Sequence, residues 1–202
     1  MRSMVSVRSR GCIGGKCDVT ETLDIVDWDG NPTGETVSRE TAHRDGIRHR
    51  TSHVWILRHG LSEETEILLQ KRCANKDSFP GCYDISSAGH IPAGQSFAFS
   101  AIRELQEELG LTVSEDALCP CGLRRFTYTG NFHDCVFRDD QVSMIYGLWY
   151  TSEMGEIHVQ PEEIESVLWL PINTCVQDVA ENRIPHCIFL EELAILRRGM
   201  GI

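Results

Sequence analysis

The chain has 202 residues, and its 30 acidic side chains outnumber its 19 basic ones, which gives a formal net charge of −11 at pH 7. Such a surface repels polyanions, so the charge argues against nucleic acid as a partner. The same field opposes a small anionic ligand, and a site for one therefore needs local cations, either basic side chains or a metal ion. The hydrophobic fraction of 41% is typical of a globular protein. We expect one domain over residues 20–202, preceded by a polar tail at residues 1–19.

The cysteines and the lack of long apolar segments indicate in which cellular compartment the protein is expected. Nine cysteines are scattered along the sequence, and the closest pairs are Cys12 with Cys17 and Cys119 with Cys121. Either pair could hold a metal or a disulfide, although reduced thiols are the simpler expectation. Residues 1–16 lack the apolar run of a signal peptide, and no segment approaches the ~18 apolar residues that a membrane span requires. We therefore expect a cytoplasmic protein without membrane contact.

Two hairpins are predicted in the first third of the domain. Residues 23–28 alternate like a short strand, and the turn formers of residues 29–34 follow and lead into residues 37–45. Residues 53–57 and 66–72 are rich in β-branched and aliphatic side chains and flank a polar loop.

A central helix follows a glycine-containing loop at residues 89–94. Phe97, Ala101, Leu105 and Leu109 recur every four residues, which predicts an amphipathic helix that ends at Gly110. Further strands are predicted at residues 124–128, 142–150 and 166–170, and a closing helix at residues 188–198. Strands on both sides of a central helix predict an α/β fold, with a mixed sheet covered on both faces.

Three glutamates of the predicted helix carry the chemical argument. Glu104, Glu107 and Glu108 stand at positions i, i+3 and i+4, so their carboxylates project from one face within a turn. Like charges at this spacing destabilise an isolated helix unless a cation lies between them. Mg²⁺ meets that need, because it binds carboxylate oxygens and keeps positions for a phosphate. The alternative is an acidic helix with a solvated face.

The segment from Gly89 to Leu111 resembles the Nudix box, which reads Gly, five residues, Glu, seven residues, Arg-Glu, an aliphatic, any residue, Glu-Glu, any residue, Gly, an aliphatic. The matching positions are Gly89, Arg103, Glu104, Leu105, Glu107, Glu108, Gly110 and Leu111. The resemblance implies a Nudix-type α/β/α sandwich and a hydrolase that cleaves a small organic diphosphate with Mg²⁺, or alternatively Mn²⁺. It also implies that the three glutamates bind the metal and that Arg103 positions them, although Arg103 could equally form a generic surface ion pair.

One position departs from the Nudix box. Gln95 stands where the family has Glu, and an amide cannot act as a base. Activity could be reduced, or that carboxylate could be unimportant, and a non-catalytic Nudix ligand-binding module is an alternative function. A base from outside the box is a third possibility, and Glu163 is the candidate for it, with plain surface acidity as its alternative.

A narrower resemblance covers residues 23–170 and points to the isopentenyl-diphosphate isomerase branch of the superfamily and the hydrolases akin to it. The segments that carry it are residues 29–34, 42–50, 71–72 and 79–84. In the isomerases a cysteine and a glutamate move protons, but the corresponding positions here hold Ala88 and, at or near the second, Gln141. Neither can serve as the proton carrier, so the sequence favours hydrolysis over isomerisation.

The same resemblance suggests roles for several histidines and basic residues. His43, His49 and His90 align approximately with metal-binding histidines of the isomerases, and metal binding, substrate hydrogen bonds and structural packing all stay open for them. We place Arg50, Lys71, Arg72, Gly89 and His90 near the substrate diphosphate, with a solvent-facing role as the alternative for Lys71 and Arg72. The identity of the substrate stays open between nucleoside diphosphates, sugar nucleotides and isoprenyl diphosphates. A homodimer through the closing helix is possible.

Overall fold

The computed structural model describes residues 21–60, 63–76, 78–132 and 135–202. The tail expected at residues 1–19 lies outside these ranges, as do Cys12 and Cys17. Within them, a seven-stranded sheet forms the centre of the fold. Its strands are β3 (His49–His59), β4 (Thr65–Arg72), β5 (Tyr83–Asp84), β6 (Ser87–His90), β7 (Cys119–Phe132), β8 (Cys135–Trp149) and β9 (Ile164–Pro171).

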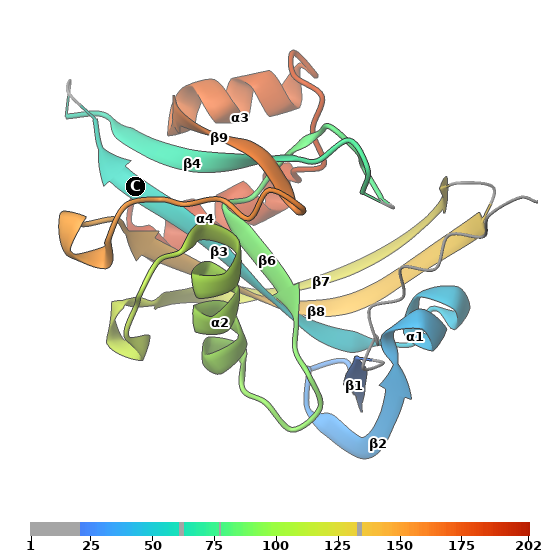
Figure 1. Ribbon diagram of the computed structural model, residues 1–202. Coiled ribbons are helices and arrows are strands. Elements are labelled where there is room, and N and C mark those ends of the chain that lie inside the picture. Colours follow the sequence, from blue (N-terminus) through green and yellow to red (C-terminus); the bar gives the residue numbers. More distant parts are fainter. Residues whose placement is uncertain (1–20, 61–62, 77, 133–134) are drawn as a thin grey trace, which may run out of the picture.

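The sheet is mixed, as the sequence predicts. β3 runs parallel to β8 and antiparallel to β4 and β6, and β7 pairs with β8 along a long hairpin. The main order is β5-β4-β3-β8-β7, with β9 paired to the other side of β4 (Figure 1). A separate two-stranded sheet is made by β1 (Thr22–Val26) and β2 (Pro32–Ser38). β6 pairs with the first half of β3, whereas β4 pairs with the end of β3. Where β6 is paired to β3, β4 is not, so β3 and β4 diverge from each other there.

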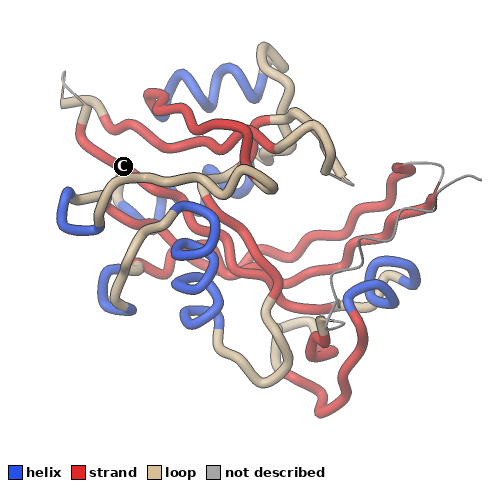
Figure 2. Tube along the Cα trace, in the orientation of Figure 1, coloured by secondary structure: helices blue, strands red, loops and turns tan. Residues whose placement is uncertain are grey.

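Helices cover both faces of the sheet (Figures 1 and 2). On one face α2 (Phe97–Leu109) packs Leu105 and Leu109 against Val54 and Ile56 of β3. The opposite face, which includes Trp55 and Leu57 of β3, is covered by α3 (Ile172–Ala180) and α4 (Leu190–Met200). Adjacent residues of β3 therefore contribute to two different cores, as the two-residue period of a strand requires.

Local sequence explains where α2 begins and ends. The Ser96 hydroxyl accepts a hydrogen bond from the Phe99 amide at 3.1 Å, which satisfies one of the free amides of the first turn. Gly110 closes the helix with φ of 69°, a left-handed conformation that favours glycine. Its amide donates to the Gln106 carbonyl at 3.2 Å.

Several of the predicted helices and strands are confirmed, and two of the predicted strands are shorter than the strands of the structure. The hairpin of β3 and β4, the bounds of α2 and the closing helix α4 are confirmed. β7 and β8 extend well beyond residues 124–128 and 142–150, because they pair with each other over nearly their whole length. α1 (Arg39–Asp45) and α3 were not predicted, although Ile172, Cys175 and Val179 form the buried stripe that would have revealed α3.

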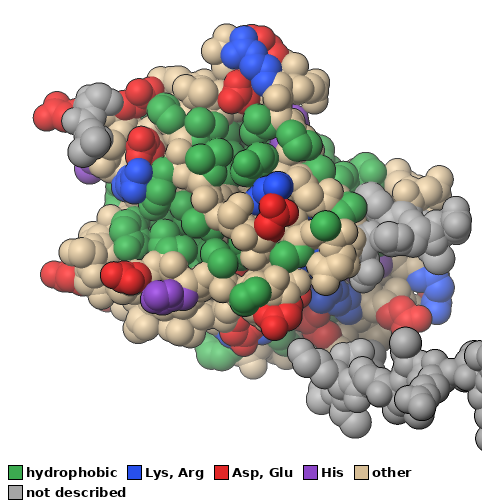
Figure 3. All heavy atoms as spheres, turned by 45° about the horizontal axis from the view of Figure 1, so that its top comes forward, with side chains coloured by type: hydrophobic (Ala, Val, Ile, Leu, Met, Phe, Trp, Pro, Cys, Tyr) green, Lys and Arg blue, Asp and Glu red, His purple; other side chains and the backbone are tan. Residues whose placement is uncertain are grey.

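One face of the surface is rich in apolar side chains. Figure 3 shows hydrophobic side chains gathered on the side that carries α3 and β9. On β9, which pairs only with β4 among the described strands, Leu168 is 39% exposed. A homodimer stays a prediction. No helix within the described residues has the length and apolar character needed to cross a membrane.

Candidate active site

The three glutamates of α2 line one large cleft, which has a volume of about 1190 Å³. Their exposure differs, since the side chains of Glu104 and Glu107 are 14% and 52% exposed and Glu108 is buried. Arg103 donates to Glu104 at 2.6 Å and to Glu107 at 3.0 Å, so one guanidinium holds two of the three carboxylates. We call this group, with Gly89 and Ser87 of β6, the glutamate end of the cleft.

β6 fits closely against these carboxylates. Gly89 lies beside Glu104, and a Cβ at position 89 would overlap the carboxylate of that glutamate. Only glycine at position 89 therefore leaves room for the Glu104 carboxylate. The fully buried Ser87 hydroxyl donates to Glu108 Oε2 at 2.7 Å, which fixes the orientation of that carboxylate.

The electrostatics of this end favour an added cation. Burial raises the pKa of Glu104 to about 7, although Arg103 opposes the shift. Burial likewise raises the pKa of Glu108 to about 7 against the opposing effect of its hydrogen bond from Ser87. Two carboxyls thus hold protons near neutral pH unless positive charge stabilises their ionised forms. Carboxylate oxygens are the ligands of Mg²⁺ and Mn²⁺, so this donor set fits either ion.

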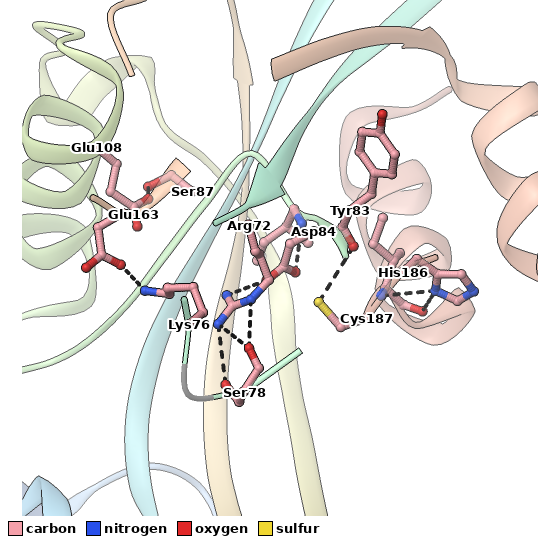
Figure 4. Close-up of polar contacts among 12 residues, drawn as sticks. Arg72, Lys76, Ser78, Tyr83, Asp84, Ser87, Glu108, Glu163, His186 and Cys187 are labelled. Carbon is pink, nitrogen blue, oxygen red and sulfur yellow. Dashed lines mark hydrogen bonds and ion pairs between the residues drawn. The ribbon is translucent and has the colours of Figure 1, made fainter. Parts of the chain in front are cut away.

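Basic side chains and a fourth glutamate stand next to the glutamate end. Glu163, which precedes β9, lines the cleft and forms an ion pair with Lys76, and Figure 4 shows this pair beside Glu108 and Ser87. Arg72 also lines the cleft, where it donates to Asp84 at 3.0 Å and to the Ser78 carbonyl. Lys76 was not identified from the sequence, because nothing in the segment after β4 shows that this side chain lies in the cleft beside Glu163.

Two of the expected phosphate-binding residues lie elsewhere. Arg50 is buried against Asp24, with an N–O distance of 2.8 Å, and it also donates to the Gln95 carbonyl. Lys71 points away from the cleft and pairs with Glu165 at 2.7 Å, because its side chain alternates with that of Arg72 along β4. Neither residue lines the cleft, and this corrects the expectation that both would face the diphosphate.

Gln95 is exposed in the loop before α2 and does not line the cleft either. Its backbone carbonyl accepts the Arg50 hydrogen bond at 3.0 Å, and that contact does not depend on the side chain. The departure from the Nudix box at this position therefore removes no carboxylate from the glutamate end.

The three histidines come together at another part of the cleft, which His43 and His90 line and behind which His49 is buried. The nitrogen atoms that His43, His49 and His90 offer lie within 4.8 Å of one another, and the Nε2 atoms of His43 and His90 are 3.0 Å apart. Asp139 Oδ1 lies 3.6 Å from His49 Nε2. Burial and the nearby His49 lower the pKa of His43 to about 4, so its imidazole is neutral at pH 7. Neutral imidazoles suit a transition-metal ion better than Mg²⁺.

A third group of side chains forms what we call the inner wall, opposite α2 across the sheet. Its members are Thr51, His53, Arg124, Phe126, Gln141 and Glu192. Glu192 of α4 accepts hydrogen bonds from His53 Nδ1 at 2.9 Å and from Trp55 at 3.0 Å. Arg124 lies 3.5 Å from Glu192 and stacks its guanidinium on Phe126 at 4.4 Å. No local sequence motif predicts this wall, because its residues come from four separate elements.

Comparisons with known proteins agree with this fold and site. The NUDIX domain profile matches residues 48–188. Nudix hydrolase 3 of Arabidopsis thaliana is 37% identical over 75% of this chain, which spans only 19% of that protein's length. A Nudix hydrolase of Clostridium acetobutylicum is 30% identical over 89% of this chain and 82% of its own. The crystal structure of a protein from Deinococcus radiodurans superposes with a TM-score of 0.61 at 19% identity, over 86% of this chain and 98% of that one.

Proposed function

The chain belongs to the Nudix family of hydrolases, and from this premise we propose that it cleaves the diphosphate linkage of a small organic diphosphate with Mg²⁺ or Mn²⁺. Members of the family generally use such divalent ions. One observation carries the proposal: three carboxylates of α2 converge in a cleft where Arg72 and Lys76 add positive charge. This combination offers a place for a metal ion and for a phosphate in spite of the negative net charge of the protein.

In this proposal Glu104, Glu107 and Glu108 hold the metal ion, and Arg103 keeps the first two in position. The bound ion would neutralise phosphate oxygens and lower the pKa of a coordinated water. Gly89 leaves room for the Glu104 carboxylate, and Ser87 fixes that of Glu108. These contacts hold the ligands before substrate arrives, which reduces the reorganisation needed during the reaction.

The remaining residues act on the substrate and the proton. Arg72 and Lys76 contact the diphosphate, as Gly89 and His90 do from β6. A water oxygen forms a bond to one phosphorus while the bond from that phosphorus to the bridging oxygen breaks. The water proton passes to Glu163, or to a glutamate of α2, and the second phosphate leaves.

Chromatographic product analysis of a panel of organic diphosphates, with phosphate release measured for those that have a terminal phosphate, tests this proposal. The panel contains nucleoside diphosphates, sugar nucleotides and isoprenyl diphosphates, each with Mg²⁺, with Mn²⁺ and with a chelator. We expect cleavage of at least one class in the presence of metal and none with the chelator. Binding of a diphosphate without any cleavage would instead favour a ligand-binding module.

An isomerase of isoprenoid diphosphates is the second candidate, and the cluster of His43, His49 and His90 is the observation that favours it. Against it stand Ala88 and Gln141, which both line the cleft but cannot transfer a proton as a cysteine or a glutamate does. Incubation with isopentenyl diphosphate separates the two functions, since an isomerase would give dimethylallyl diphosphate without releasing phosphate. The narrower place of the chain within the superfamily stays a prediction.

A further inference from the structure

Two glutamine side chains stand out in the cleft because their amides are without a hydrogen-bond partner among the residues that the structure describes. Gln70 and Gln141 line the cleft and are only 4% and 9% exposed. Among the described residues, no side-chain hydrogen bond is formed by either amide. Neither amide is among the fully buried polar groups that lack a partner, so both amides are open to the cleft, where a ligand or water can complete their hydrogen bonds.

Gln141 is the more informative of the two, because two other residues of the inner wall, Thr51 and His53, already have hydrogen-bond partners of their own. Thr51 donates to Ser143 at 2.7 Å, and His53 bonds to Glu192 at 2.9 Å. The inner wall therefore does not need the Gln141 amide to satisfy its own donors and acceptors. Gln70, in contrast, lies two residues before Arg72 on β4, close to the cation expected to contact the diphosphate.

The strand register places Gln141 beside an aromatic surface. In β8 it lies opposite His49 of β3 on one side and opposite Phe126 of β7 on the other. The Phe126 ring packs against Phe189 with 4.6 Å between centroids. A group that reaches Gln141 thus meets an amide with two donors and one acceptor beside two tilted aromatic rings.

We propose that Gln141 is a specificity-determining residue that hydrogen-bonds the non-phosphate part of the substrate. This inference rests on the proposed function. The part that it recognises carries hydrogen-bond donors and acceptors, as a sugar or a heterocyclic base does. An isoprenyl chain has neither, and it would bury the amide without a partner. Sites built to hydrogen-bond a substrate discriminate strongly against analogues that lack the group.

Steady-state kinetics of Gln141→Leu test this assignment, with Gln177→Leu on the exposed face of α3 as the matched control. The probes are adenosine diphosphate glucose, phosphoribosyl diphosphate and dimethylallyl diphosphate. For Gln141→Leu we expect kcat/KM to fall at least about tenfold for a polar probe, mainly through KM. Dimethylallyl diphosphate should be unaffected or cleaved better. A loss confined to the nucleotide probe identifies the base as the partner of the amide, and a loss with both polar probes identifies the sugar.

Two further readouts separate recognition from a structural role. Because Leu removes an amide that forms no side-chain hydrogen bond with the described residues, Tm of Gln141→Leu should equal or exceed that of the wild type, and Mn²⁺ affinity should not change. Equal losses of kcat/KM for all three probes, a lowered Tm or weakened Mn²⁺ binding would overturn the inference. If neither these probes nor any member of the substrate panel is cleaved, the proposed function fails. Calorimetric binding of adenosine diphosphate glucose then still tests Gln141, with weaker binding by Gln141→Leu expected and unchanged binding contradicting it.

Discussion

Glu108 at the glutamate end and Glu192 in the inner wall are both buried, yet their pKa values shift in opposite directions. Burial raises the pKa of Glu108 to about 7. Burial acts in the same direction on Glu192, but His53, with Arg124 and Trp55, lowers its pKa overall. The inner wall therefore satisfies its own charge, whereas the glutamate end leaves negative charge for something else to neutralise. The groups that contact a buried carboxylate thus decide whether it is neutralised within the fold, as Glu192 is, or is left available to a cation, as Glu108 is.

Replacing each carboxylate by its amide should give opposite results. Glu108→Gln is expected to lower diphosphate cleavage by more than about a hundredfold, equivalent to ~2.7 kcal/mol of barrier, and to leave stability unchanged or raised. Glu192→Gln breaks a buried ion pair and should lower the free energy of unfolding by about 3–5 kcal/mol. Phosphate release and urea denaturation measure the two effects. Glu115→Gln, which lies away from the cleft, is the control and should change neither.

If Glu108→Gln destabilised the protein as much as Glu192→Gln does, the distinction between the two regions would be lost. Full activity of Glu108→Gln would remove the metal site from the proposal.

Gly89→Ala tests how closely β6 fits the glutamate end. The added methyl group displaces the Glu104 carboxylate, so activity and Mn²⁺ affinity should fall about ten- to a hundredfold. Gly60→Ala is a matched control, because its methyl group would also contact a glutamate, Glu66, at 3.0–3.2 Å, but away from the cleft. Activity assays and Mn²⁺ titration followed by electron paramagnetic resonance compare the two variants. Equal losses in both would show that the effect is not specific to Glu104.

The raised pKa values predict how pH affects stability. The pKa values of Glu104 and Glu108 are about 7 in the folded protein, against a usual 4.5. Between pH 4.5 and pH 7 the folded protein therefore keeps protons on these two carboxyls that the unfolded chain has released. Without metal, their contribution to stability therefore falls as pH rises from 4.5 to 7. Because metal binds the ionised carboxylates, its affinity should rise about tenfold per pH unit for each proton displaced below pH 7.

Thermal unfolding with MgCl₂ and with a chelator, between pH 5 and 8, measures both trends. The stabilisation by Mg²⁺ should grow with pH and should shrink in Glu108→Gln. A shift in Tm that is independent of pH would contradict the assignment of these two carboxylates as ligands.

Ser86 and Ser87 offer the smallest contrast, since both are fully buried but have different partners. Ser87→Ala removes the hydrogen bond to Glu108 and should weaken Mn²⁺ binding about three- to tenfold with little change in stability. Ser86 donates to the Leu68 carbonyl at 2.6 Å and accepts from the Ile56 amide at 2.8 Å. Ser86→Ala should instead lower the free energy of unfolding by about 1–3 kcal/mol and leave Mn²⁺ binding intact. The reverse pattern would contradict the positioning role of Ser87.

The two regions also differ in how far the sequence could predict them. At the glutamate end the proposed metal ligands lie within a single helix, so the spacing of Glu104, Glu107 and Glu108 was enough to bring them together. Gly89 and Ser87 come from β6, which directly precedes that helix. Local periodicity and capping therefore predicted both the helix and its chemistry.

The inner wall depends on contacts between distant segments, and no short motif encodes them. His53 and Glu192 are 139 positions apart, and they meet only because α4 folds onto the face of β3 opposite α2. Arg50 illustrates the converse error. It stands in the segment expected to face the diphosphate, but its alternation along β3 turns it toward Asp24.

Hydrolysis in H₂¹⁸O tests the central claim most directly. A substrate that the panel of organic diphosphates has identified is cleaved by the wild-type protein in labelled water with Mg²⁺, and the products are analysed by mass spectrometry. We predict one ¹⁸O atom in one phosphate product, none in the organic product beyond its phosphate, and no reaction when a chelator replaces Mg²⁺. Cleavage that places the label on carbon, or that proceeds equally well without a divalent ion, would contradict metal-assisted attack of water on phosphorus.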